Sequence, residues 1–186
     1  MIPLDTKAPS FKLLNVSTQN AVTIKEDGHA GHLVAFVCNH CPFVIHLLEH
    51  FTAYFNKLEN ENIAVYLISS NDAEKYPDDH PSKMKELAIS SGFSFPYLYD
   101  ESQSVAQSYK AACTPDFFLF DPQLSLYYRG RYDDSRPGNG LPVNGLDLKN
   151  AVDRLLAEDP PSLPQHPSMG CNIKWKPDNE PDYFKS

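Results

Sequence analysis

The chain has 186 residues, 41% of them hydrophobic, and a formal net charge of −8. This size and composition suit one globular domain with a sizeable core. The acidic balance argues against a nucleic-acid partner, and no run approaches the roughly 20 apolar residues of a membrane span. The first residues also lack the basic and then apolar pattern of a secretory signal. We therefore expect a cytoplasmic protein with no membrane partner, a setting in which cysteine pairs tend to be catalytic or metal-binding.

The first third of the chain predicts a hairpin followed by a βαβ unit. Residues 11–16 and 21–24 flank a polar turn and predict a short β-hairpin. Residues 32–37 are almost wholly apolar, as in a strand buried on both faces. Residues 42–58 place apolar side chains at helical spacing, and residues 63–68 predict a second buried strand. The two strands should therefore be parallel, with a right-handed crossover.

The remainder predicts further helices and an antiparallel hairpin. The expected elements are a loop at 72–81, helices at 81–90 and 102–110, strands at 117–120 and 124–131, a loop at 133–145 and a helix at 146–157. The acidic groups of the two loops, Asp78, Asp79, Asp133 and Asp134, are interpreted as solvated side chains. The sum is an α/β sandwich with a mixed sheet.

Six of the sixteen prolines fall between Pro160 and Pro181, which argues against a helix or a central strand there. We therefore divide the chain into a domain at 1–159 and an extended Pro-rich tail at 160–186 that packs on the same domain. Trp175 is expected to anchor this tail, because a lone large aromatic side chain in a polar segment has much area to bury.

Cys38 and Cys41 stand at the predicted junction of strand and helix. Free backbone N–H groups and the helix dipole favour an anion at that place, so we expect a lowered pKa and a nucleophilic role for Cys38. A redox dithiol is one interpretation of the pair. Half of a zinc site is the other, and only Cys113 and Cys171 could complete a cysteine tetrad.

A Cys-x-x-Cys after the first core strand resembles the thioredoxin superfamily, and Pro115 stands where that superfamily has a cis proline facing the dithiol. Residues 7–13 look like the entry of its alkyl hydroperoxide reductase/thiol-specific antioxidant (AhpC/TSA) branch. The segment Gly-Cys-Asn-Ile-Lys-Trp at 170–175 is similar to a bacterial subgroup labelled only "thioredoxin family protein". The resemblance covers about residues 5–157. It implies a thioredoxin-like α/β/α sandwich with a central mixed sheet, an N-terminal β-hairpin and an extended C-terminal tail, without a cofactor.

The chain departs from thioredoxin inside the motif. Asn39 and His40 fill the ring between the cysteines, and a histidine before the second cysteine is similar to the protein disulfide isomerases. A cationic His40 would favour the Cys38 thiolate and make the disulfide more oxidising. The buried acid that thioredoxin carries on a neighbouring strand is absent, so proton transfer from Cys41 needs water or another residue.

The chain also departs from the peroxiredoxins, which resemble Pro-x-x-x-Thr-x-x-Cys. Counting back from Cys38 places Ala35 at the threonine position, and counting back from Cys41 places Cys38 there, so neither register supplies the hydroxyl. Arg129 or Arg131 could provide the cation of a peroxidase, but nothing in the sequence aims either at a cysteine.

These residues predict a thiol–disulfide oxidoreductase in which Cys38 attacks a disulfide and Cys41 resolves the mixed disulfide. His40 supports the thiolate, while Thr114 and Pro115 position a substrate segment on a free Thr114 backbone. The expected partners are protein or small-molecule disulfides and thiols, with a reductant such as thioredoxin or glutathione.

Two further thiols and two rival functions stay open at this point. Cys113 and Cys171 are either additional redox thiols or structural residues. The rival functions are a peroxiredoxin-like antioxidant peroxidase and a non-catalytic metal-binding protein of thioredoxin fold.

Overall fold

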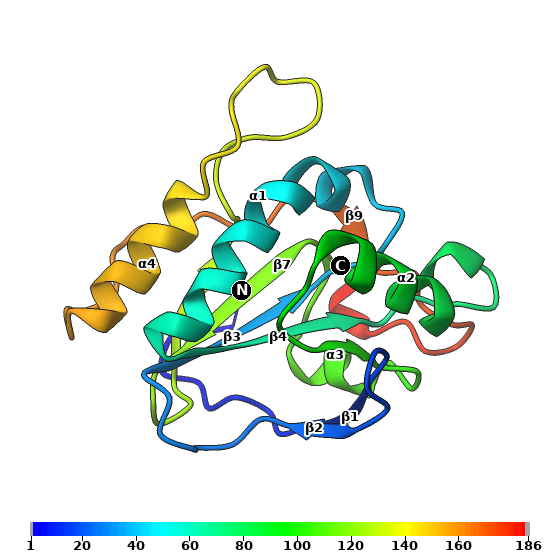
Figure 1. The fold of residues 1–186 in the computed structure, drawn as a ribbon, viewed down its shortest axis with the longest axis horizontal. Helices are drawn as coiled ribbons and strands as arrows, with labels where there is room; N and C mark the ends of the chain where they lie inside the picture. The colour runs from blue at the N-terminus through cyan, green and yellow to red at the C-terminus, as the bar shows by residue number, and fades with distance from the viewer. Residues whose placement is uncertain (1, 185–186) are drawn as a thin grey trace.

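The structure is a computed structural model that describes residues 2–184 (Figure 1). Its centre is a seven-stranded mixed sheet in the order β2-β1-β5-β4-β3-β7-β8, in which β3, β4 and β5 run parallel. The strands are β1 (Lys12–Asn15), β2 (Ala21–Thr23), β3 (Gly31–Phe36), β4 (Ile63–Ser69), β5 (Tyr97–Tyr99), β7 (Asp116–Phe120) and β8 (Leu126–Gly130). A separate two-stranded ladder joins β6 (Cys113–Thr114) to β9 (Cys171–Asn172).

The helices are α1 (Pro42–Leu58), α2 (Pro81–Ser91), α3 (Ser104–Ser108) and α4 (Leu146–Leu156). Short 3-10 turns occur at Glu59–Glu61, Pro77–Asp79 and Asp182–Phe184. Between residues 2 and 184, no helix is both long and apolar enough to cross a bilayer.

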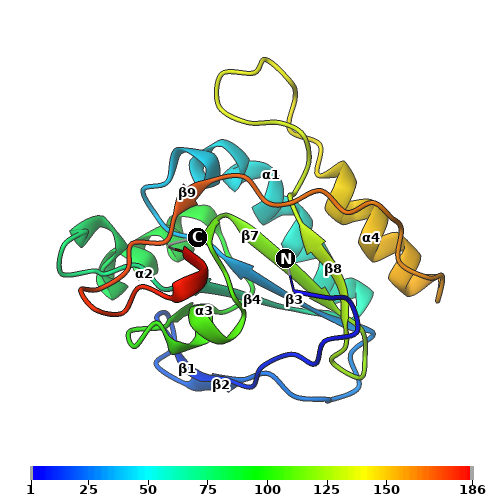
Figure 2. The same ribbon diagram turned by 180° about the vertical axis from the view of Figure 1, so that it is seen from behind.

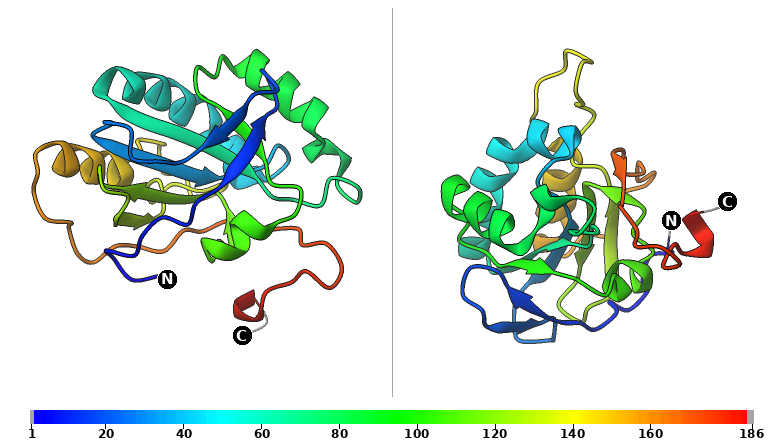
Figure 3. Two further views of the ribbon diagram at one scale, coloured as in Figure 1. Left: turned by 90° about the horizontal axis from the view of Figure 1, so that it is seen from below. Right: turned by 90° about the vertical axis from the view of Figure 1, so that its right-hand side faces the viewer.

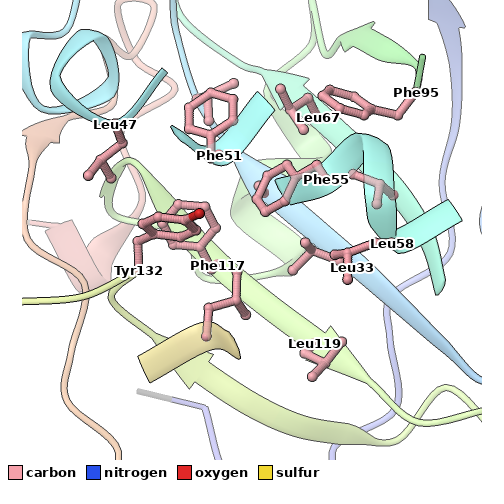
Figure 4. Packing of buried hydrophobic residues seen from close by; sticks show 14 of the residues in the cluster. Leu33, Leu47, Phe51, Phe55, Leu58, Leu67, Phe95, Phe117, Leu119 and Tyr132 are labelled. Atoms are coloured by element: carbon pink, nitrogen blue, oxygen red, sulfur yellow. The ribbon is translucent and has the colours of Figure 1, made fainter. Parts of the chain in front are cut away.

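One face of the sheet is covered by α1, α2 and α4 (Figure 1). Figure 4 shows Phe51 and Phe55 of α1 in one cluster with Leu33 of β3 and Phe117 of β7, and all four side chains are fully buried. The Phe55 ring also meets the Tyr132 ring edge to face, with centroids 6.2 Å apart. Burying a side chain of this size contributes about 1.5–3 kcal/mol, so these contacts hold the second half of α1 on this face of the sheet.

The opposite face is covered by the N-terminal segment, α3 and the tail (Figures 2 and 3). Phe36 and Phe118 of the sheet pack against Tyr109, just after α3, and against the buried Ile173 and Trp175 of the tail. Trp175 is 7% exposed, which confirms its predicted role as an anchor. The tail therefore completes one of the two cores.

The predicted sandwich, the N-terminal hairpin, the parallel βαβ unit and the helix at 42–58 are all confirmed. The helix expected at 102–110 is shorter, and β5, β6 and β9 were not predicted, because strands of two or three residues are too short to show a periodicity. The interpretation of Asp133 as solvated is wrong. It is 4% exposed, and its carboxylate accepts hydrogen bonds from the backbone N–H groups of Ser135, Asn144 and Gly145.

Candidate redox site

The two cysteines of the motif lie at the start of α1, buried side by side. Cys38 is 1% exposed and Cys41 is fully buried, and all four cysteines of the chain are thiols in this structure. Cys41 is the N-cap residue of α1 and Pro42 is its first residue. Opposite them, the Thr114–Pro115 peptide bond is cis, as predicted.

The loop before Pro115 touches both sulfurs. The hydroxyl of Thr114 lies 3.4 Å from the Cys38 sulfur, and the Cys41 thiol lies 3.1 Å from the Thr114 carbonyl oxygen, to which it donates when protonated. Thr114 is itself 2% exposed. The predicted juxtaposition of Cys38, Cys41, Thr114 and Pro115 is therefore present.

The sequence interpretation missed Asp79. It was interpreted as a solvated loop residue, which is wrong, because its side chain is fully buried. One carboxylate oxygen accepts a hydrogen bond of 2.7 Å from the backbone N–H of Asn39. The other accepts one of 2.7 Å from the Asn71 side chain and lies 2.7 Å from Nδ1 of His40. The two amide donors replace water and the His40 ring lies beside them, which is why a carboxylate is tolerated here.

The His40 ring contacts the Asp79 carboxylate through its Nδ1 atom. Its ring stacks on Tyr76 with centroids 5.6 Å apart and an interplanar angle of 5°. One atom each of Cys38, His40 and Asp79 lie within 4.8 Å of one another. A metal ion would find three ligands here, and not in the cysteine tetrad considered from the sequence. Both Asp79 oxygens, however, already accept amide hydrogen bonds.

The electrostatics of the pair are the reverse of the expectation. Hydrogen bonds from Cys38 and, more weakly, from Cys171 lower the pKa of Cys41 to about 4 despite burial, with a further contribution from the Val44 amide. The hydrogen bond to Cys41, burial and the negative charge of Asp79 raise the pKa of Cys38 well above its ordinary value. The expectation of a lowered pKa at Cys38 is wrong, because the hydrogen bond to Cys41, burial and Asp79 all favour the protonated form of Cys38. Cys41, not Cys38, is the N-cap residue of α1. Pro42 was the available signal, since proline favours the first helical position.

The tail occupies the backbone edge that was expected to be free. β9 pairs antiparallel with β6, in the register Thr114 to Cys171 and Cys113 to Asn172. The N–H of Ile173 donates to the carbonyl of Ala112 at 3.2 Å, so the ladder extends past the two paired residues. The prediction of an open Thr114 backbone is therefore wrong, because the chain supplies its own strand there.

The two additional cysteines differ in their relation to the pair. The Cys171 thiol is hydrogen-bonded to Cys41 and is half-buried. The Cys113 thiol donates to the carbonyl of Pro115 at 3.6 Å, and burial raises its pKa. The structure therefore brings Cys171, and not Cys113, into contact with the dithiol.

The two arginines considered as peroxidase cations are engaged elsewhere. Arg129 lies 3.3 Å from the Asp116 carboxylate, donates to the Lys110 carbonyl and stacks over Phe118. Arg131 pairs with Asp147. Both guanidinium groups are therefore engaged in structural contacts.

A thioredoxin-type fold with paired cysteines facing a cis proline defines a class of thiol redox proteins. The chain matches the AhpC/TSA family over residues 4–129, and it belongs to that family. Thiol–disulfide oxidoreductase or peroxidase-type chemistry is the activity that this membership supports.

Two solved structures resemble the whole chain. An uncharacterised conserved protein from Geobacillus kaustophilus is 47% identical, with a TM-score of 0.93 over 96% of this chain and 95% of its own. A hypothetical protein from Sinorhizobium meliloti is 42% identical, with a TM-score of 0.92 over 95% and 97%. The thioredoxin domain of a thiol-disulfide oxidoreductase from Bacteroides vulgatus, 17% identical with a TM-score of 0.63 over 84% and 99%, shares the fold. None of the curated proteins matches the chain.

Proposed function

We propose that this protein is a thiol–disulfide oxidoreductase whose redox centre is the pair Cys38 and Cys41. The observation that carries the proposal is the polarised pair itself. Both sulfurs lie against Thr114, at 3.4 Å and 3.1 Å, beside the cis Pro115, and the hydrogen bond between them lowers the pKa of Cys41 and raises that of Cys38. A structural pair of buried cysteines has no need of such an arrangement.

The net reaction oxidises the dithiol and reduces an external disulfide to two thiols. The Cys38–Cys41 bond forms, two electrons pass to the external disulfide, and the proton of Cys38 has to leave its sulfur. Asp79 and His40 each place a side-chain atom within 4.8 Å of that sulfur, where they can accept the proton. They therefore supply the acid–base pair that the apolar strand before Cys38 lacks. The charge distribution favours Cys41 as the attacking sulfur, with Cys38 closing the disulfide.

The test is a disulfide-reduction assay with wild type and three single variants. We expect a loss of at least 100-fold in the rate of insulin or small-disulfide reduction in each of two variants: Cys41→Ser, which lacks the attacking sulfur, and Cys38→Ser, which lacks the sulfur that closes the disulfide. Cys113→Ser is the matched control and should retain the wild-type rate, because its thiol donates to the Pro115 carbonyl and not to either sulfur of the pair. A wild-type rate in both Cys38→Ser and Cys41→Ser would contradict the proposal.

A peroxidase is the second candidate, and one observation favours it. The Thr114 hydroxyl, 3.4 Å from the Cys38 sulfur, supplies from another part of the chain the hydroxyl that Ala35 cannot. The arginines argue against it, because Arg129 and Arg131 bind Asp116 and Asp147. Hydrogen peroxide consumption with a sulfenate trapped at a motif cysteine would favour a peroxidase. A rate no faster than that of a free thiol would reject it.

The partners follow from the same chemistry. A protein of this type needs an external disulfide as oxidant and an external thiol as reductant, such as thioredoxin or glutathione, and we propose that it meets them in the cytoplasm.

The metal-binding alternative is tested by native mass spectrometry of the protein with zinc. That alternative would be favoured if the wild-type protein bound zinc tightly and stoichiometrically, lost this binding in Asp79→Asn, and never formed a disulfide.

A further inference from the structure

The site presents a problem of access. Cys38 and Cys41 are at most 1% exposed, so neither sulfur can be approached in line by an external thiolate in this arrangement. Cys171 is half-buried and therefore reaches the surface, and its thiol is hydrogen-bonded to Cys41. Among the four cysteines, Cys171 alone combines exposure with contact to the dithiol.

Cys171 stands where a substrate cysteine would stand. It pairs with Thr114 across an antiparallel ladder, on the loop edge beside the cis proline where an external strand would add. Gly170 makes this approach close, because a methyl group at that position would overlap the Thr114 carbonyl. The tail therefore holds a cysteine against Cys41 in the manner of a bound peptide.

The tail is held on the domain by more than this ladder. The N–H of Lys174 donates to the Asn71 side chain at 2.9 Å, and its carbonyl accepts from the N–H of Asp72 at 2.8 Å. The Gln103 side chain bonds the Lys174 carbonyl at 2.9 Å and accepts from the N–H of Lys176 at 2.8 Å. With Ile173 and Trp175 also buried, displacement of the tail by an external strand would expose core surface.

We propose that Cys171 is a third redox thiol, which carries the disulfide between the buried Cys41 and an external thiol at the surface. This inference rests on the proposed function of the Cys38–Cys41 pair. In this proposal the exchange with the external thiol takes place at Cys171 of the tail. The external partner is a small or flexible thiol, because the Thr114 strand edge is already paired with the tail.

Each step exchanges one disulfide for another. In the oxidised protein the Cys171 thiolate attacks the Cys41 sulfur. The Cys38–Cys41 bond breaks, the Cys41–Cys171 bond forms, and Cys38 leaves with the electron pair and takes up the proton that Cys171 gave up. An external thiolate then attacks Cys171, and Cys41 leaves as a thiolate. A second external thiolate attacks the resulting mixed disulfide, which releases the external disulfide and Cys171. The sum converts the Cys38–Cys41 disulfide and two external thiols into the dithiol and one external disulfide.

The direction of attack in the second step follows from the two leaving groups. Hydrogen bonding lowers the pKa of Cys41, whereas burial raises that of Cys171 to about 11. The better leaving group is the thiol with the lower pKa, so an external thiolate that attacks Cys171 expels Cys41 readily. The partial exposure of Cys171 and the better leaving-group ability of Cys41 thus both favour external attack on the Cys171 sulfur.

Disulfide mapping of Cys38→Ser provides the direct test. After oxidation of the full chain with diamide, peptide mass spectrometry should find a single disulfide, Cys41–Cys171, and the same bond in Cys38→Ser/Cys113→Ser. Absence of an intramolecular disulfide in Cys38→Ser, or a Cys41–Cys113 bond in its place, would overturn the inference.

Kinetics distinguish a failure of the relay from a failure of the proposed function. The rate at which glutathione reduces the oxidised protein should fall at least tenfold in Cys171→Ser and be unchanged in Cys113→Ser. Gly170→Ala keeps every cysteine but displaces the tail, and it should slow the same step, whereas Met169→Ala, at a half-exposed neighbour, should not. A wild-type rate in Cys171→Ser would overturn the relay and leave the Cys38–Cys41 centre intact. A wild type that never forms Cys38–Cys41 would overturn both.

Discussion

The two cysteines of the motif face opposite chemical surroundings although they are three residues apart. On one side, Cys38 meets the buried carboxylate of Asp79, and its pKa is raised. On the other side, Cys41 meets hydrogen-bond donors from Cys38, from Cys171 and from the start of α1, and its pKa is lowered. We call these the acidic side and the tail side of the dithiol. The difference polarises the pair before any substrate binds, so the reduced site already holds one thiolate and one proton.

The sharpest test of this polarity is a pH titration of the reduced protein. The thiolate absorbance at 240 nm should persist as the pH falls from 9 and be lost only near the pKa of Cys41, about 4. Cys41→Ser should lose this low-pH thiolate, whereas Cys113→Ser should retain it. If wild type showed no thiolate absorbance below about pH 9, this result would contradict the polarity.

The same shift has a consequence for stability with a definite sign. In the unfolded chain Cys41 has its ordinary pKa of 9.0, and in the folded chain the pKa is lower. A lowered pKa stabilises the folded state fully above the unfolded value, and this contribution is lost as the pH falls through the folded value. The free energy of unfolding of reduced wild type should therefore fall between pH 9 and about pH 4 relative to that of Cys41→Ser.

Removal of the tail anchor should weaken the tail side. Trp175→Ala should lower the free energy of unfolding by about 3–5 kcal/mol, as for other buried large aromatic residues. Urea denaturation of the reduced protein measures this loss. Met169→Ala, which is half-exposed in the same tail, should change stability by less than about 0.5 kcal/mol. Equal effects of the two variants would show that the tail is not part of the core.

Removal of the buried charge should act on the acidic side alone. Asp79→Asn should lower the pKa of Cys38 by about 1 pH unit, about 1.4 kcal/mol, because a like charge no longer opposes its thiolate. The pH dependence of alkylation, read for each cysteine by peptide mass spectrometry, measures the shift. Asp78→Asn removes an exposed neighbouring charge and is the matched control. An equal shift in both variants would indicate a general surface effect.

The smallest expected effect concerns the half-buried Cys171 thiol of the tail. The positive charge of Lys174 lowers the pKa of Cys171 and partly offsets the rise that burial causes. Lys174→Met should therefore raise the pKa of Cys171 by only about 0.3 pH units, about 0.4 kcal/mol, because solvent and salt screen partly exposed charges. The pH profile of Cys171 alkylation measures this change, with Lys176→Met as control. A downward shift would contradict the sign of the interaction.

The sequence predicted the parts of the site that local patterns encode. A continuous apolar run, a helical stripe from Val44 to Leu58 and a proline before the next strand sufficed for the fold and for the position of the cis Pro115. Asp79 could not be predicted in the same way, because its burial depends on Asn39 and Asn71, which only the tertiary structure brings together.

The tail shows the same limit from the other direction. Its prolines correctly argued against a helix, and Trp175 correctly indicated an anchor. The pairing of Cys171 with Thr114, however, joins residues more than 50 positions apart through a two-residue strand. No periodicity exists in so short a segment, so only the proximity of the folded chain reveals it.

The Lys174–Asn71 hydrogen bond joins residues 103 positions apart, near the end of the chain and near its middle. Contacts of such sequence separation form late, because the closure of a long loop has to precede them. On the ribosome, the residues before the tail emerge first. The newly made domain therefore passes through an interval in which Cys41 and the Thr114 edge are uncovered. In that interval the strand edge is open to other chains, and the arrival of residues 170–175 closes it.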